Sequence, residues 1–104
     1  METKSKAQTF VGFVIRSGKY RIGLNSVESL KKAELILVCK SAAENSVKQI
    51  KSVAARLHCP LLLSVNKTLE EMTSKPNAKV MAVTDKALAK AILENYEEDF
   101  ISVD

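Results

Sequence analysis

The sequence has 104 residues, of which 46% are hydrophobic and 27% are charged. This mixture is typical of one globular domain and excludes a fibrous or wholly disordered chain. The 16 Lys and Arg residues outnumber the 12 Asp and Glu residues, an excess that suits a polyanionic partner but is shared by many domains without one. Because no apolar run approaches the roughly 18 residues of a membrane span and the first residues are polar and unlike a signal segment, we expect a cytoplasmic protein with no membrane partner.

Three apolar runs without polar alternation lie at residues 35–39, 61–65 and 80–83. A run of this kind is typical of an interior strand that is covered on both faces, as in a sheet with parallel pairs. A shorter strand is expected at residues 20–22.

Helical periodicity and capping signals predict helices before, between and after these strands. Side chains three residues apart that can bind each other's backbone amides, such as Asn25 and Glu28, mark three helix starts. Gly18 is the expected left-handed stop of the first helix. The three pairs are Ser5–Gln8, Asn25–Glu28 and Ser41–Glu44. Helices are expected over residues 6–17, from residue 25, over residues 44–57, from residue 66 or 67 to 72, and, after Thr84 and Asp85, over residues 86–96.

This alternation of helices and strands predicts an α/β fold, which we expect to be a three-layer α/β/α sandwich around a four-stranded mixed sheet. Residues 1–96 would form this single domain, and residues 97–104 an acidic C-terminal tail. Five acidic residues lie after position 93, where there is no Lys or Arg. Such a tail either aids solubility or folds over the basic body and competes with a polyanion.

Motifs for catalysis or metal binding are incomplete. The sequence around Gly18 does not match a phosphate loop, because Gly12 lies six residues before it instead of five. The lone His58 is interpreted as a capping or surface residue. Cys39 and Cys59 form no Cys-x-x-Cys pair and are predicted to be buried, reduced packing residues. We therefore expect a protein that is not an enzyme and that binds no cofactor or metal.

Basic residues concentrate between positions 4 and 32, where seven Lys and Arg residues accompany a single acid, Glu28. The turn-rich stretch 16–25 brings cations to the expected start of a helix, where free backbone amides favour phosphate. Asn25 adds an amide that can bind a base edge. Nucleic-acid binding is one interpretation of this stretch, and an ordinary helix cap surrounded by solvated cations is the other.

Three passages resemble the kink-turn RNA-binding ribosomal protein family, which includes the archaeal L-seven-Ae type, the eukaryotic L-thirty type and small bacterial relatives. Residues 13–19 resemble the ending of the family's first helix, residues 35–45 its strand and following helix start, and residues 81–93 its last strand and helix. The resemblance covers roughly residues 6–95. It implies the family's fold and the recognition of structured RNA by shape and exposed bases.

The family contacts the paired purines of a kink-turn with a Gly-x-Asn-Glu element, and Gly23 and Asn25 match its first and third positions. Ser26 stands where the family has Glu, Leu24 where Thr is usual, and the loop 73–79 lacks the apolar residues that cover an extruded base. The resemblance implies a ribosomal or messenger RNA partner, with the ribosome as a candidate assembly. The departures keep open a protein-interaction module on the same fold with a degraded RNA surface. The implied RNA-binding residues are Lys19, Arg21, Gly23, Leu24, Asn25, Ser26, Lys32, Ser74 and Lys75.

Overall fold

In a computed structural model that describes residues 5–103, helices and strands alternate along the chain. The described part contains one mixed sheet of five strands in the order β1-β4-β2-β3-β5. Strands β2 and β3 are parallel, and the other neighbouring pairs are antiparallel. None of the helices in this part is long and apolar enough to span a membrane. The elements are α1 (Lys6–Ser17), β1 (Tyr20–Ile22), α2 (Leu24–Glu28), β2 (Leu35–Val38), α3 (Glu44–Leu57), β3 (Leu61–Ser64), α4 (Leu69–Thr73), β4 (Val80–Val83), α5 (Lys86–Glu94) and β5 (Phe100–Ser102).

The prediction of four strands is wrong, because β5 adds a fifth. It pairs with β3 in an antiparallel register that sets Leu63 opposite Ile101 and Ser64 opposite Phe100. The strand lies in the segment expected to be an acidic tail, and its three residues are too few to show strand periodicity in the sequence. Phe100 is only 1% exposed, so this segment contributes to the core.

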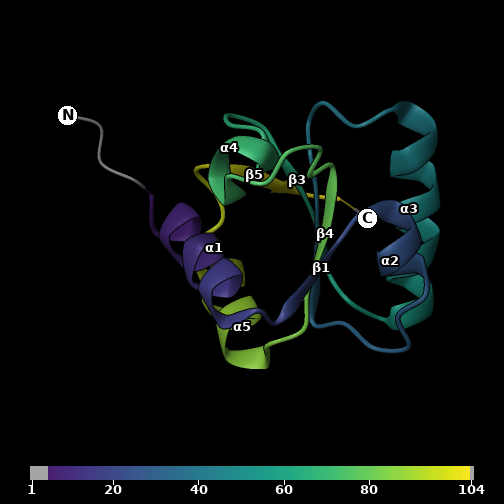
Figure 1. The fold of residues 1–104 in the computed structure, drawn as a ribbon, viewed down its shortest axis with the longest axis horizontal. Coiled ribbons are helices and arrows are strands. Elements are labelled where there is room, and N and C mark those ends of the chain that lie inside the picture. Colours follow the sequence, from purple (N-terminus) through teal and green to yellow (C-terminus); the bar gives the residue numbers. More distant parts are fainter. Residues whose placement is uncertain (1–4, 104) are drawn as a thin grey trace.

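Helices cover both faces of the sheet (Figure 1). On one face, α1, α4 and α5 pack over a cluster that includes Leu35 and Leu37, and on the other, α2 and α3 pack over a cluster that includes Ile36 and Val38. Consecutive residues of a strand point to opposite faces. Every residue of β2 and β4 is therefore buried, and the prediction that these apolar runs are interior strands is confirmed.

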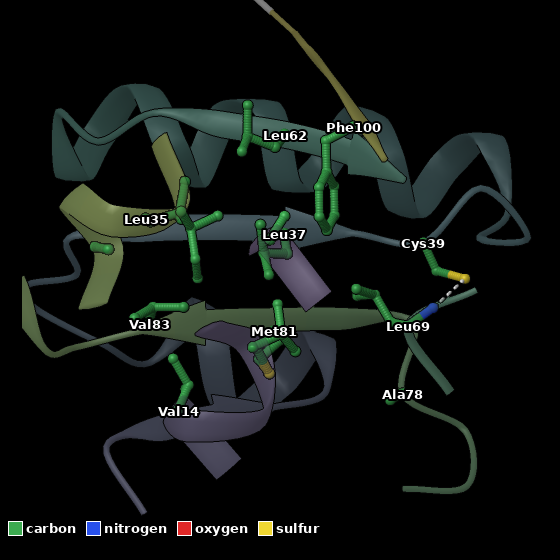
Figure 2. Packing of buried hydrophobic residues seen from close by; sticks show 14 residues of the cluster. Val14, Leu35, Leu37, Cys39, Leu62, Leu69, Ala78, Met81, Val83 and Phe100 are labelled. Atoms are coloured by element: carbon green, nitrogen blue, oxygen red, sulfur yellow. Dashed lines mark hydrogen bonds between the residues drawn. The ribbon is translucent and has the colours of Figure 1, made fainter. Parts of the chain in front are cut away.

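The first of these clusters joins segments from both ends of the chain (Figure 2). Val14 of α1, Leu37 of β2 and Met81 of β4 are each 0% exposed, and Phe100 of β5 is 1% exposed. Burying a side chain of this size contributes about 1.5–3 kcal/mol relative to leaving it in water. The first helix and the last strand consequently stabilise the same core.

Three helix ends follow the predicted signals. The Ser5 hydroxyl accepts the Gln8 N–H at the start of α1, and Gly18 ends that helix with a left-handed φ of 74°. At the start of α5, the Asp85 carboxylate accepts the Leu88 N–H. These side chains satisfy backbone groups that the helices leave unpaired.

The predicted cap at Ser41 is wrong. Ala43 is the N-cap of α3 and provides no side-chain hydrogen bond. Ser41 lies in the preceding turn, and its hydroxyl accepts a hydrogen bond from Lys79 Nζ at 2.7 Å. The next helix, α4, also begins later than expected. Its N-cap is Thr68, which forms a capping box with Glu71, the third residue of the helix.

The acidic segment after α5 folds against α1 and β3. Asp99 is 2% exposed, and its carboxylate accepts hydrogen bonds from the Ser5 hydroxyl and from Gln8 Nε2. The Asp99 carbonyl accepts the Val65 N–H at 2.9 Å. Because β5 and β1 are opposite edges of the sheet, this segment does not cover the basic turn at residues 16–25.

Candidate nucleic-acid interface

A single residue, Gly23, connects β1 to α2. Its N–H donates to the Val80 carbonyl at 2.9 Å, which extends the pairing of β1 with β4 by one residue. Gly23 has a φ of 101° and a ψ of 143°, a conformation that residues with a side chain rarely adopt. Glycine therefore allows the chain to leave the strand and enter the helix at once.

Because α2 begins at Leu24, its N-cap is Gly23, and the predicted cap at Asn25 is wrong. Asn25 is the second residue of α2 and is exposed, as is Ser26. No side chain caps this helix, so the Asn25 amide is not used in capping. Leu24 is half-buried and packs against the cluster under α2 and α3.

The loop that precedes β4 lies beside this turn. Gly23 is hydrogen bonded to Val80, the first residue of β4, so the end of the 74–79 loop that joins β4 lies near the start of α2. Ser74 and Lys75 of this loop are exposed. We call this region the loop-end surface, defined by Gly23, Leu24, Asn25, Ser26, Ser74 and Lys75.

A carboxylate of α4 clamps the 74–79 loop. Glu70 Oε1 accepts a hydrogen bond from Lys79 Nζ at 2.9 Å, and Glu70 Oε2 accepts the Asn77 N–H at 3.1 Å. Asn77 has a φ of 60°, which asparagine tolerates better than most residues. The hydrogen bond from Lys79 is the main cause that holds the pKa of Glu70 below its ordinary value. The Glu70 carboxyl group is therefore ionised at neutral pH.

We expect Glu70→Gln to loosen this loop without unfolding the protein. Glutamine has no charge to attract Lys79, and its NH2 group, which cannot accept a hydrogen bond, replaces one of the two oxygens that bind Lys79 and Asn77. The Asn77 amide should exchange with solvent faster in the variant, as measured by hydrogen exchange followed by NMR. Glu71→Gln is the matched control, because Glu71 binds Thr68 instead. Equal acceleration in both variants would show that Glu70 does not hold the loop.

The clamp should also respond to acid. Since the folded-state pKa of Glu70 lies below its ordinary value, its stabilisation is complete above that ordinary value and is lost as pH falls through the lowered pKa. Exchange of the Asn77 amide, corrected for its intrinsic pH dependence, should therefore accelerate in acid in the wild type. The Glu70→Gln variant should lack this step.

The predicted cations Lys19 and Lys32 lie at the other end of the sheet, away from the loop-end surface. The Lys19 side chain is 64% exposed, and its Nζ lies 3.7 Å from the carboxylate of Asp85. The Lys32 side chain is 85% exposed, and its Nζ lies 3.9 Å from the carboxylate of Glu34. Arg21 is exposed in the middle of β1, between the two ends. The structure therefore divides the predicted RNA-binding residues between two places.

Two pairs of residues at these ends were not predicted from the sequence. Glu70 and Lys79 shape the loop, but nothing local in the sequence shows that a residue of α4 binds one beyond the turn at Asn77. Lys86 and Lys90 are exposed on α5 near Lys19 and Lys32. Their spacing of four residues places them on one helix face and was a usable signal.

Within residues 5–103, no group of three or more His, Cys, Asp or Glu side chains is placed to hold a metal ion. Both cysteines are free thiols, Cys39 buried and Cys59 half-buried. Cys39 Sγ accepts the Leu69 N–H at 3.4 Å at the start of α4 (Figure 2). Burial raises the pKa of the Cys59 thiol, with a smaller contribution from Glu34. The predicted packing role describes Cys39 fully and Cys59 in part.

No protein-family model and no curated protein matches the sequence. Among solved structures, a protein of unknown function from Bacillus halodurans is similar to this chain with a TM-score of 0.79 and 16% sequence identity. The similarity covers 88% of this chain and 96% of that chain. At this identity the likeness concerns the fold alone, and the fold that the two chains share is a mixed α/β one.

Proposed function

We propose that this protein is a non-enzymatic RNA-binding protein of the ribosomal type, which recognises structured, kink-turn-like RNA on the three-layer α/β/α arrangement of the kink-turn family. One observation carries the proposal. The hydrogen bond from Gly23 to Val80 brings the start of α2 beside the residue that follows the 74–79 loop, so two segments far apart in the sequence meet at one end of the sheet. The family resemblance implies RNA contacts from these same two segments.

The proposed roles follow from exposure and chemistry. Gly23 lets an RNA backbone approach closely because it has no side chain. The exposed Asn25 amide offers both a donor and an acceptor to a purine edge. Lys75 of the 74–79 loop and Arg21 of β1 are exposed cations and suit phosphate contacts.

Mobility shifts with a kink-turn RNA and a matched simple duplex, each at two salt concentrations, test the proposal. We expect tighter binding to the kinked RNA and an affinity for both that falls steeply with salt, because bound cations displace counterions from RNA. Absence of binding to either RNA at low salt would show that the proposal is wrong.

The variant Asn25→Ala should reduce the preference for kinked RNA. Loss of a two-bond contact with a base edge lowers discrimination by about 1–3 kcal/mol, or roughly 5- to 150-fold. Asn45→Ala is the matched control, because Asn45 is also an exposed second residue of a helix, α3. Unfolding midpoints should be similar in the two variants. If Asn25→Ala binds kinked RNA like the wild type, Asn25 does not contact a base.

A protein-interaction module on the same fold is the second candidate. The observation in its favour is that Val65 is 38% and Ile101 is 49% exposed, next to one another where β3 ends and β5 pairs with it. This candidate predicts a partner that stays bound after nuclease treatment and is lost in an Ile101→Ser variant. Under the RNA hypothesis, that variant binds kinked RNA normally.

A further inference from the structure

A groove lies between lysine side chains at the end of the sheet opposite the loop-end surface. The groove has a volume of about 310 Å³ and is lined by Lys86 and Lys90 of α5, by Glu34 and His58, and by apolar side chains that include Pro60 and Leu93. Lys86 and Lys90 are both exposed and lie one turn apart, about 6 Å along the helix axis. The groove therefore has a partly apolar floor and a cationic rim.

Two further lysines lie close to this groove, because each forms an ion pair with a carboxylate in the groove or next to it. Lys32 Nζ lies 3.9 Å from Glu34, which lines the groove. Lys19 Nζ lies 3.7 Å from Asp85, the residue before Lys86. We call this region the lysine-end surface, defined by Lys19, Lys32, Lys86 and Lys90 with Glu34 and Asp85. Since the four lysines outnumber the two carboxylates, the surface attracts anions.

The loop end of the sheet also carries both lysines and carboxylates. Lys79 is bound to Glu70 at 2.9 Å, and Glu71 lies next to Glu70 on α4. Lys40 and Lys67 lie close enough to Glu71 to interact with its charge. Positive charge therefore lies at both ends of the sheet, and at the lysine end, where the sequence resemblance implied only Lys19 and Lys32, it lines a groove.

We propose that the lysine-end surface binds the phosphate backbone of the same structured RNA, as a second contact region that strengthens binding without reading bases. This inference rests on the proposed function. Arg21, exposed at the middle of β1, lies between the two surfaces. The three-residue strand spans about 10 Å, so one RNA can contact both. The four lysines come from three separate segments, namely the turn before β1, the loop before β2, and α5. Lysines spread in this way suit several successive phosphates better than one small anion.

A Lys86→Gln/Lys90→Gln double variant of the full chain tests the inference. We expect the affinity for kink-turn RNA and for duplex RNA to fall alike, by roughly 10-fold at about 0.1 M salt. The slope of log affinity against log salt should decrease by about 1–2, since each lost phosphate contact removes about 1. The preference for kinked RNA should stay unchanged, in contrast with Asn25→Ala. Lys6→Gln/Lys48→Gln, which removes two exposed helix lysines that do not line the groove, is the matched control.

NMR titrations of the wild type give a readout that does not depend on folding of the variants. Kink-turn RNA should shift the backbone amides of Lys86, Lys90 and Leu93 together with that of Asn25. Inorganic phosphate, titrated alone, should shift the groove amides only weakly and without saturation in the millimolar range.

The outcomes separate this inference from the proposed function. If wild-type protein binds RNA but the Lys86/Lys90 variant keeps the affinity and salt slope of the Lys6/Lys48 control, the lysine-end surface is not an RNA contact, and the proposed function stands. If phosphate saturates the groove and RNA does not shift its amides, the groove is a small-anion site and the inference is wrong. If the wild type binds neither RNA, both proposals are wrong.

Discussion

Replacing Phe100 with alanine should lower the free energy of unfolding by about 3–5 kcal/mol. The Phe100 side chain is 1% exposed and points from β5 toward Leu37 in the cluster under α1, α4 and α5 (Figure 2). Its truncation removes buried apolar surface and leaves a cavity, which β3 and β2 cannot close because each is hydrogen bonded on both sides. Small domains have about 5–15 kcal/mol of stability, so the denaturation midpoint should fall far below that of the wild type.

Ile101→Ala is the matched control, because it shortens the neighbouring residue of the same strand. Ile101 is 49% exposed and faces the other side of the sheet, so its truncation should cost about 1 kcal/mol or less. Small and equal losses in the two variants would show that residues 100–102 do not belong to the core and that the segment behaves as a tail.

The burial of Phe100 changes how the acidic segment can be tested. Deleting residues 95–104 removes β5 as well as the charges, so a loss of RNA binding after deletion would reflect unfolding. Glu97 and Glu98 are exposed, and their replacement by glutamine removes charge while it leaves Phe100 and Asp99 in place. Any competition between this segment and RNA is measured with that double variant.

The interior of the fold was predictable because its strands are uniform. The run at residues 35–39 is apolar at every position, and only a strand between two layers of helices buries all of β2. The same holds for β4. The strand β5 could not be found in this way, since a buried Phe100 next to exposed Ile101 and Ser102 has no pattern until Leu62 and Ser64 of β3 provide its pairing partners.

The candidate site was less predictable because pairing between distant segments decides its geometry. The spacing of Asn25 and Glu28 fits a cap, but the bond between Gly23 and Val80 moves the helix start to Leu24. The concentration of Lys and Arg along residues 4–32 predicted that Lys19 and Asn25 belong to one site. The strand β1 instead places them at opposite ends of the sheet. Only the pairing of β1 with β4 shows which loop faces α2.

Gly23→Ala should destabilise the protein by about 1–3 kcal/mol and disturb the loop-end surface. No atom lies within 4 Å of a Cβ added at Gly23, so the expected loss comes from backbone strain at φ 101° and not from a clash. The chain can relieve this strain only by moving the β1–α2 turn, which weakens the hydrogen bond to Val80 and shifts Asn25. Denaturation gives the stability, and mobility shifts give the preference for kinked over duplex RNA.

Gly18→Ala separates the two effects, because Gly18 also has a positive φ, 74°, and no atom within 4 Å of an added Cβ. Alanine in this left-handed conformation should cost roughly 1–2 kcal/mol, but Gly18 lies between α1 and β1 at the lysine end. The two variants should therefore lose similar stability, while only Gly23→Ala loses the preference for kinked RNA. If both variants keep that preference, the β1–α2 turn does not position the RNA-contacting residues, and base recognition lies elsewhere on the protein.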